Sequence, residues 1–162
     1  MNFLRKFAMS FVHAFRGLKF AVLNERNFRV HILAIVYTLS FAAVYGLNGY
    51  EYGVLVLTFA LVPAMELINT AVENAVNIET TEFNRFARIA KDTSAAAVLV
   101  AAFAAIGVAI SLFSDPEKLS AAAKIIFSVP NIIWVLLSLI PAGLFLVCCR
   151  SKEETEKENK NI

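Results

Sequence analysis

The chain has 162 residues, of which 59% are hydrophobic and only 17% are charged, and its net charge is +2. Soluble domains average about 45–50% apolar and about 25% charged residues, so this composition argues against an ordinary soluble domain. It also excludes an intrinsically disordered chain, which needs low hydrophobicity. A net charge this small does not suggest a nucleic-acid-binding protein, whose footprint is a strongly basic face.

The first 29 residues predict an amphipathic helix that lies on a membrane surface. Phe7, Phe11, Phe15 and Leu18 recur three or four positions apart, which is the spacing of one helical face. Basic residues interrupt the segment, whereas a secretory signal has an unbroken apolar run and a cleavage site. We therefore expect an interfacial helix. The alternative is a helix that packs on the end of a bundle.

Four long apolar blocks follow, and each is long enough to cross a bilayer. A spanning helix needs about 20 apolar residues, and the blocks are residues 30–47, 52–76, 93–113 and 125–149. The predicted fold class is an all-α integral membrane protein with an N-terminal amphipathic surface helix, three core transmembrane helices and an additional fourth C-terminal transmembrane helix. In the fourth, Pro130 and Pro141 predict an N-terminal turn and a kink.

The basic residues predict the orientation of these helices. Thirteen of the 15 Lys and Arg residues fall in the N-terminal segment, the 77–91 loop and the C-terminal tail. Basic loops stay in the cytoplasm, so we expect both termini on that side. The predicted organisation is a membrane domain (1–113), an extra loop with the fourth helix (114–149) and a disordered charged cytoplasmic tail (150–162). Cys148 and Cys149 are adjacent and predict no disulfide.

One carboxylate lies inside the second apolar block. Glu66 follows 14 mostly apolar residues, which puts it roughly 20 Å from the outer end of the helix. A carboxylate at that depth is a functional-site hypothesis by default. Asn69 and Glu73 fall within a sector of roughly 60° on the same helix. Together the three residues predict a polar stripe that descends toward the cytoplasm.

The predicted topology places further polar residues beside this stripe. Glu25 precedes the first span, and Lys91 and Asp92 open the third, all on the cytoplasmic side. Clustered carboxylates need a cation or a proton, and Mg²⁺ uses one or two carboxylates together with substrate phosphates. A metal–nucleotide site with Glu66 as general base toward a lipid alcohol is therefore one hypothesis. Structural hydrogen bonds between helices and an ion or proton relay remain open.

The sequence resembles the prokaryotic diacylglycerol kinases, a family of small integral membrane lipid kinases. Residues 66–73, Glu-Leu-Ile-Asn-Thr-Ala-Val-Glu, resemble the family signature. Residues 16–29 resemble its N-terminal segment, and Ala-Lys-Asp at 90–92 with the apolar run at 95–99 resembles its third motif. The order and spacing also match, and the resemblance covers about residues 10–110.

The resemblance implies an enzyme of the bacterial cytoplasmic membrane that transfers the γ-phosphate of Mg–ATP to a lipid hydroxyl. Family members are homotrimers of three-helix protomers with an N-terminal surface helix. Residues 1–113 would then be the lipid kinase domain. Carried onto this sequence, the resemblance makes Glu66 the catalytic base and Glu25 and Glu73 the magnesium ligands. It assigns nucleotide contact or orientation of the site to the polar residues Lys91, Asp92, Asn69, Arg16, Lys19 and Lys6.

The lipid acceptor is predicted from residues 26–31. They resemble the Gram-positive branch, whose members are commonly undecaprenol kinases, whereas Gram-negative enzymes tend to have a carboxylate where His31 stands. We expect undecaprenol as acceptor, with diacylglycerol as the alternative; His31 could instead make an interfacial hydrogen bond. Asn77 stands where the family usually has Asp, and the family gives no role for the fourth helix. The non-enzymatic alternatives are a small transporter that uses Glu66 as a relay and a structural membrane subunit.

Overall fold

The computed structural model describes residues 3–79 and 84–147, and it contains six helices and no strand within those two ranges. The helices are α1 (Phe3–Asn24), α2 (Arg26–Tyr45), α3 (Gly49–Glu79), α4 (Arg85–Leu112), α5 (Pro116–Ile126) and α6 (Val129–Val147). Helices α2, α3, α4 and α6 are long and apolar enough to cross a membrane. The predicted all-α membrane fold with four spans is thereby confirmed.

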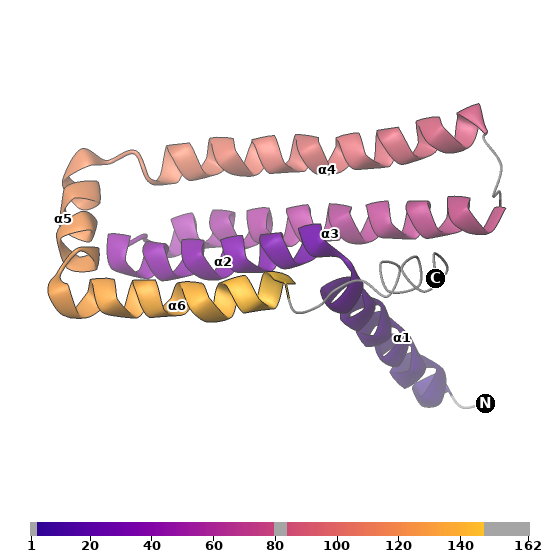
Figure 1. Ribbon diagram of the computed structural model, residues 1–162, viewed down its shortest axis with the longest axis horizontal. Coiled ribbons are helices and arrows are strands. Elements are labelled where there is room, and N and C mark those ends of the chain that lie inside the picture. The colour runs from indigo at the N-terminus through magenta and orange to yellow at the C-terminus, as the bar shows by residue number, and fades with distance from the viewer. Residues whose placement is uncertain (1–2, 80–83, 148–162) are drawn as a thin grey trace, which may run out of the picture.

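The four long helices run alongside one another, with α5 across one end of the bundle and α1 leaving the opposite end at an angle (Figure 1). Helix α3 packs against both α4 and α2, while α6 contacts α2 and α5. Helices α2, α3 and α4 therefore form one unit around α3. Helix α6 is an addition to α2, on the side away from α4 (Figure 1).

Local chemistry ends one helix and starts the next at the α2–α3 turn. Gly46 closes α2 at φ 78°, a left-handed conformation that favours glycine, and its N–H donates to Ala42 O at 3.0 Å. Asn48 Oδ1 then accepts from the Glu51 amide at 3.0 Å, and Glu51 Oε2 accepts from the Asn48 amide at 2.7 Å. This reciprocal pair is a capping box, which fixes where α3 begins.

The segment before the fourth span corrects a sequence prediction. Residues 114–128 were expected to form a loop and the start of the span, but α5 occupies 116–126 and the span begins only at Val129. The reason is an N-cap that the apolar pattern does not reveal: the Asp115 carboxylate accepts from the amides of Glu117 and Lys118 at 2.9 and 3.2 Å. Pro130 lies in the first turn of α6, and α6 continues through Pro141 to its end.

An aromatic cluster attaches α5 to the ends of α2 and α4. The rings of Phe41, Tyr45 and Phe113 pack with centroids 5.0 to 5.7 Å apart. The Tyr45 hydroxyl accepts from the Asp115 amide at 2.9 Å, and the Lys118 ammonium lies 5.6 Å from the Tyr45 ring centroid. These contacts tie the cap of α5 to the core of the bundle.

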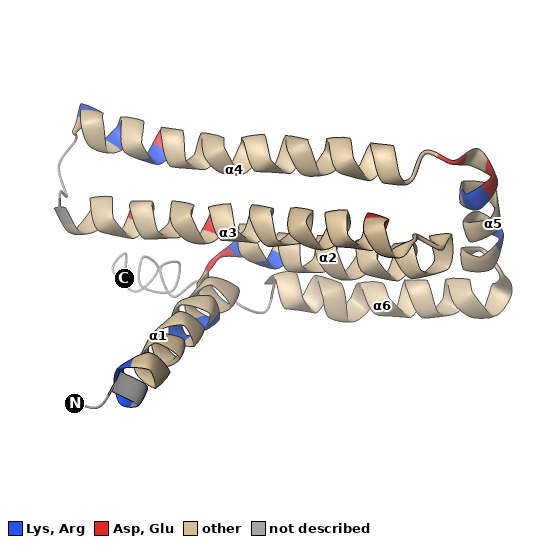
Figure 2. Cartoon of the chain, turned by 180° about the vertical axis from the view of Figure 1, so that it is seen from behind, with Lys and Arg blue, Asp and Glu red and all other residues tan. Residues whose placement is uncertain are grey.

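Most charged residues of the bundle lie toward its two ends, α3 carries acidic residues between them, and long stretches of α2, α4 and α6 carry no charge (Figure 2). Helix α1 carries several of the basic residues, and its apolar residues Phe7, Phe11 and Phe15 are exposed. An exposed apolar row beside basic residues fits the predicted surface helix. The two cysteines and the predicted charged tail lie outside the described residues.

Candidate functional site

The predicted base Glu66 is buried inside α3 and faces a histidine of α2. Only 5% of Glu66 is exposed, and its Oε1 lies 3.2 Å from Nε2 of His31. An ionised carboxylate can only accept hydrogen bonds, so the imidazole nitrogen is the donor in this pair. The structure therefore joins a residue predicted as catalytic with one that sequence reasoning considered only for lipid choice or as an interfacial hydrogen bond.

One turn further along α3, a chain of hydrogen bonds connects α3 with α4. The Asn69 Nδ2 group donates to Glu73 Oε1 at 3.0 Å, and Ser94 Oγ donates to Asn69 Oδ1 at 2.7 Å. The carboxylate fixes the amide orientation because it accepts only, which leaves Oδ1 for the serine. Asn69 is therefore hydrogen-bonded both to Glu73 on its own helix and to Ser94 of α4.

Lys91 and Asp92 lie in the second turn of α4 but do not face the same partners. Lys91 Nζ donates to Asn77 Oδ1 at 2.7 Å, so Asn77, where the resemblance led us to expect Asp, is in contact with this lysine. Asp92 is exposed and lies 3.6 Å from Arg88 of its own helix. An exposed i,i+4 pair contributes only about 0.3–0.5 kcal/mol, so Asp92 stays accessible to a ligand.

Glu25 occupies the joint between α1 and α2, where it is the N-cap residue of α2 with an extended backbone. Helix α1 contacts both α2 and α3, so the joint lies next to the helix that carries Glu66 and Glu73. The predicted nucleotide contacts Lys6, Arg16 and Lys19 are exposed on α1. The structure does not bring these three residues into contact with the polar stripe, and their roles stay predictions.

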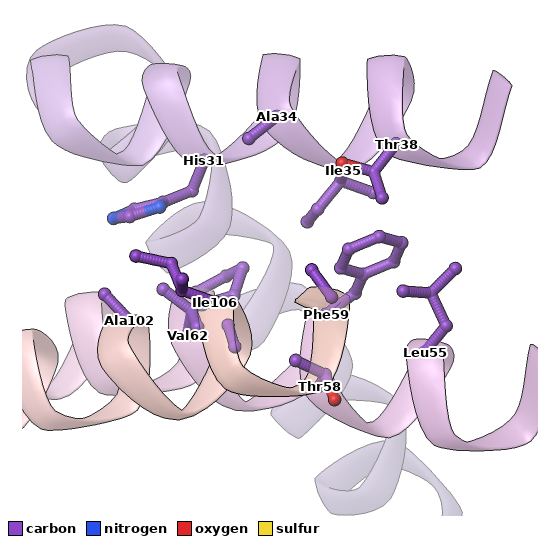
Figure 3. Close-up of a pocket in the computed structure, with 13 residues that line it drawn as sticks. His31, Ala34, Ile35, Thr38, Leu55, Thr58, Phe59, Val62, Ala102 and Ile106 are labelled. Atoms are coloured by element: carbon purple, nitrogen blue, oxygen red, sulfur yellow. The ribbon is translucent and has the colours of Figure 1, made fainter. Parts of the chain in front are cut away.

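Two adjoining cavities at the site differ in the side chains that line them. The first, about 320 Å³, is lined by Glu66, Asn69 and His31 together with apolar residues of α4. The second, about 250 Å³, is an apolar groove between α2, α3 and α4. His31 and Ala102 line both. Figure 3 shows His31 toward one end of the groove and Leu55 toward the other, with Phe59 between them.

The donor set can be compared with what a metal ion needs. Within residues 3–79 and 84–147, no three His, Cys, Asp or Glu side chains converge on one point. The described residues therefore do not form an all-protein metal cage. Glu25 and Glu73 supply separate carboxylates from two elements, which fits Mg²⁺ because this ion keeps waters and substrate phosphates among its ligands.

Comparison with known proteins places this arrangement in a family. A family model described as prokaryotic diacylglycerol kinase matches residues 12–113, well over half of the chain. The chain belongs to the prokaryotic diacylglycerol kinase family. The match ends where α4 ends, so α5 and α6 lie outside the part of the chain that it covers.

Individual relatives differ in the lipid that their names state. A diacylglycerol kinase from Synechocystis sp. is 38% identical over 109 residues, which are 67% of this chain but only 62% of that protein. An undecaprenol kinase from Bacillus subtilis is 37% identical over 118 residues, 73% of this chain and 94% of that protein. A diacylglycerol kinase from Escherichia coli is 29% identical over 94 residues, 58% of this chain and 77% of that protein.

Family membership confirms the predicted lipid kinase. It therefore favours an enzyme over the two non-enzymatic alternatives, the transporter and the structural subunit. It does not distinguish between the two lipids. Sequence reasoning missed Ser94 and the pairing of His31 with Glu66. A serine at the third position after Lys91 carries no periodic signal of its own, and only the packing of α3 on α4 shows that it meets Asn69.

Proposed function

We propose that the protein transfers the γ-phosphate of Mg–ATP to the hydroxyl group of undecaprenol at the cytoplasmic face of the bacterial membrane. The observation that carries this proposal is the position of the His31–Glu66 pair, where a cavity that contains Glu66 and Asn69 meets an apolar groove. A lipid alcohol has the same division, with a polar hydroxyl at the end of an apolar chain. Its hydroxyl can reach Glu66 while its chain lies between α2, α3 and α4.

In the proposed reaction Glu66 accepts the proton of the lipid hydroxyl. The freed oxygen forms a bond to the γ-phosphorus, and the bond between that phosphorus and the bridging oxygen of ADP breaks. His31 holds Oε1 of Glu66 at 3.2 Å, so that the base keeps its orientation. Phosphoryl transfer depends on positioning and charge neutralisation, and no covalent enzyme intermediate is needed.

The phosphates would be held at the end of the bundle where α1 and α2 meet. Glu25 and Glu73 would bind Mg²⁺, which neutralises phosphate charge when it is bound. Lys91 supplies a point charge for a phosphate oxygen, and Asn77 holds its ammonium group at 2.7 Å. Asp92 and the basic residues Lys6, Arg16 and Lys19 complete the proposed nucleotide contacts.

One relative supports undecaprenol as acceptor, while the groove itself fits either lipid. The apolar groove that leads away from His31 can take the hydrocarbon chain of a lipid alcohol. The 37% identity to an undecaprenol kinase over 94% of its length supports undecaprenol. Diacylglycerol remains the second candidate because two of the three relatives described above are named diacylglycerol kinases.

We also propose that three copies of the chain assemble. Helix α4 exposes large apolar residues along its length, among them Leu99, Phe103 and Ile106, and these can face either lipid or a second copy. The trimer of the resembled family supports a second copy. Mass measurement of the protein in a defined detergent would show a single trimeric species if this proposal holds.

The test is phosphate transfer from labelled Mg–ATP by the purified protein in lipid, with undecaprenol and diacylglycerol at equal mole fraction. We expect labelled undecaprenyl phosphate, and a loss of about 10²–10⁴-fold in kcat for Glu66→Gln. Glu51→Gln is the matched control, since it lies on the same helix and Gln also serves in a capping box. A preference for diacylglycerol would contradict the proposed lipid acceptor. An active Glu66→Gln variant would contradict the role of Glu66 as the catalytic base.

A further inference from the structure

Arg29 is buried at the point where three helices meet. Only 3% of the residue is exposed. Its Nη1 donates to the carbonyl oxygens of Val22 and Leu23 at 3.2 and 3.1 Å, and its Nη2 donates to the carbonyl oxygen of Leu146 at 3.5 Å. The first two carbonyls belong to the last turn of α1, and the third belongs to α6, next to the last residue that the structure describes in that helix.

This geometry makes one side chain a cap for the end of α1 and a link from there to α6. The last four carbonyls of a helix have no partner within the helix, and a cation at a helix C-terminus is favoured by the helix dipole, which applies to α1. The planar guanidinium group can direct separate N–H donors to both helices, which the ammonium group of a lysine cannot do in the same way. Arg29 therefore links α6, at Leu146, to the C-terminal end of α1.

A second polar contact holds α6 to α2 near the middle of both helices. The hydroxyl of Tyr37 donates to the Ser138 carbonyl oxygen at 3.2 Å or exchanges a hydrogen bond with the Ser138 hydroxyl at 3.1 Å. From Arg29 to Tyr37 and from Ser138 to Leu146 the helices advance by the same number of residues, about 12 Å. The two contacts therefore agree on one antiparallel register for α6 against α2.

Backbone hydrogen bonds join Glu25 to the helices on both sides of it. The Arg29 amide donates to the Glu25 carbonyl oxygen at 3.3 Å, and the Glu25 amide donates to the Ala21 carbonyl oxygen at 2.9 Å. The side chain of Arg29 holds the residues just before Glu25, as described above. Glu25 thus stands in an extended conformation between two helices, and its position depends on the angle at which α1 leaves α2.

We infer that α6 braces the α1–α2 joint through Arg29 and thereby sets the position of the Glu25 carboxylate. Arg29 is a positioning residue in this account, and α6 gives the joint a support that the matched segment, residues 12–113, does not itself contain. The role of Glu25 as a magnesium ligand rests on the proposed function, whereas the mechanical link between α6 and the joint does not.

The experiment compares Arg29→Lys with the double variant Tyr37→Phe, Ser138→Ala, which loosens α6 without touching the joint. Arg26→Lys is the matched control, because Arg26 is exposed in the same first turn of α2. Amide hydrogen exchange of the full-length protein in lipid reports the joint directly, through the amides of residues 21–29. The Mg²⁺ concentration that gives half-maximal phosphate transfer reports the position of Glu25.

We expect exchange at the joint to accelerate about tenfold or more in Arg29→Lys, since an ammonium group cannot replace the separate hydrogen bonds that the guanidinium group donates to α1 and α6. The double variant should accelerate it by a smaller factor, and both should raise the Mg²⁺ requirement several-fold with little change in kcat at saturation. Arg26→Lys should change neither quantity.

Two results would overturn the inference. If the double variant accelerates exchange in α6 but leaves residues 21–29 unchanged, α6 does not brace the joint. If exchange at the joint rises while the Mg²⁺ requirement stays constant, the joint does not set the position of Glu25. Should the wild-type protein show no phosphate transfer at all, the proposed function fails, while the exchange measurement still decides whether α6 and the joint are linked.

Discussion

At the scale of single residues, the Glu66 carboxylate is held by chemistry that the membrane makes necessary. A charged group inside a spanning helix is costly unless it has a partner or water, and Glu66 is 5% exposed. His31 supplies the partner at 3.2 Å and lines both adjoining cavities. The hydrogen bond to His31 satisfies the carboxylate in this buried position and holds Oε1 in one orientation.

Substitution of His31 tests whether this contact serves the reaction. In His31→Leu the Glu66 carboxylate loses the hydrogen bond that orients it. We expect kcat to fall by roughly tenfold or more, because a misplaced catalytic group can cost about 10²-fold in rate. His31→Gln keeps an N–H donor and should retain most of the activity. The measurement is steady-state phosphate transfer at saturating lipid. Equal rates for the Leu variant and the wild type would show that the contact is only structural.

The polar stripe of α3 shows which side-chain contacts can be predicted from the sequence and which cannot. The spacing of Glu66, Asn69 and Glu73 predicts a shared face, and the structure shows Asn69 bonded to Glu73. The partners from other helices could not be predicted, because helical periodicity describes one helix and not which residues of its neighbours meet it. Ser94 is the clearest case, since its role depends entirely on how α4 packs on α3.

At the scale of elements, the helix ends carry information that apolar blocks do not. The four spans follow from block length alone, but α5 was missed because its apolar residues are spaced around a short amphipathic helix rather than gathered in a run. Asp115 followed by Pro116 is an N-terminal signal of a helix, and the structure shows that cap in place. Attention to caps would have separated Ile125 and Ile126 from the fourth span.

The cap of α4 gives a stability prediction. Asn84 Oδ1 accepts from the amides of Phe86 and Ala87 at 2.9 and 3.3 Å, and this cap starts the helix that carries Lys91 and Asp92. Asn84→Ala should lower the free energy of unfolding by about 1 kcal/mol, while Asn84→Asp should preserve it because Asp caps as well as Asn. Thermal or denaturant unfolding in detergent measures the difference. A loss in the Asp variant equal to that in Ala would contradict the capping explanation.

At the scale of the whole molecule, the two ends of the bundle differ in charge and in chemistry. Helices α2 and α4 begin toward the end at which α1 leaves the bundle (Figures 1 and 2). Their first two turns carry Arg26, Arg85, Arg88 and Lys91, and Glu25 lies directly before α2. The opposite end carries α5 and the aromatic cluster around Tyr45. Basic residues mark the cytoplasmic side, so the end that holds the proposed nucleotide site is also the one expected to face ATP.

This coincidence makes the sidedness of the reaction a test of the whole arrangement. In sealed vesicles of one orientation, Mg–ATP added to the side of the basic end should give phosphorylated lipid, and Mg–ATP added to the α5 side should give none. Orientation is read from two single-cysteine variants in a background without Cys148 and Cys149, Ser10→Cys on α1 and Ser120→Cys on α5, using a reagent that does not cross membranes. Because Glu66 lies between the two ends, its burial alone does not decide from which side phosphate arrives. Product formed when Mg–ATP is added to the α5 side would show that the nucleotide binds at the opposite end from the one proposed. It would also contradict the proposed roles of Glu25 and Glu73 as magnesium ligands.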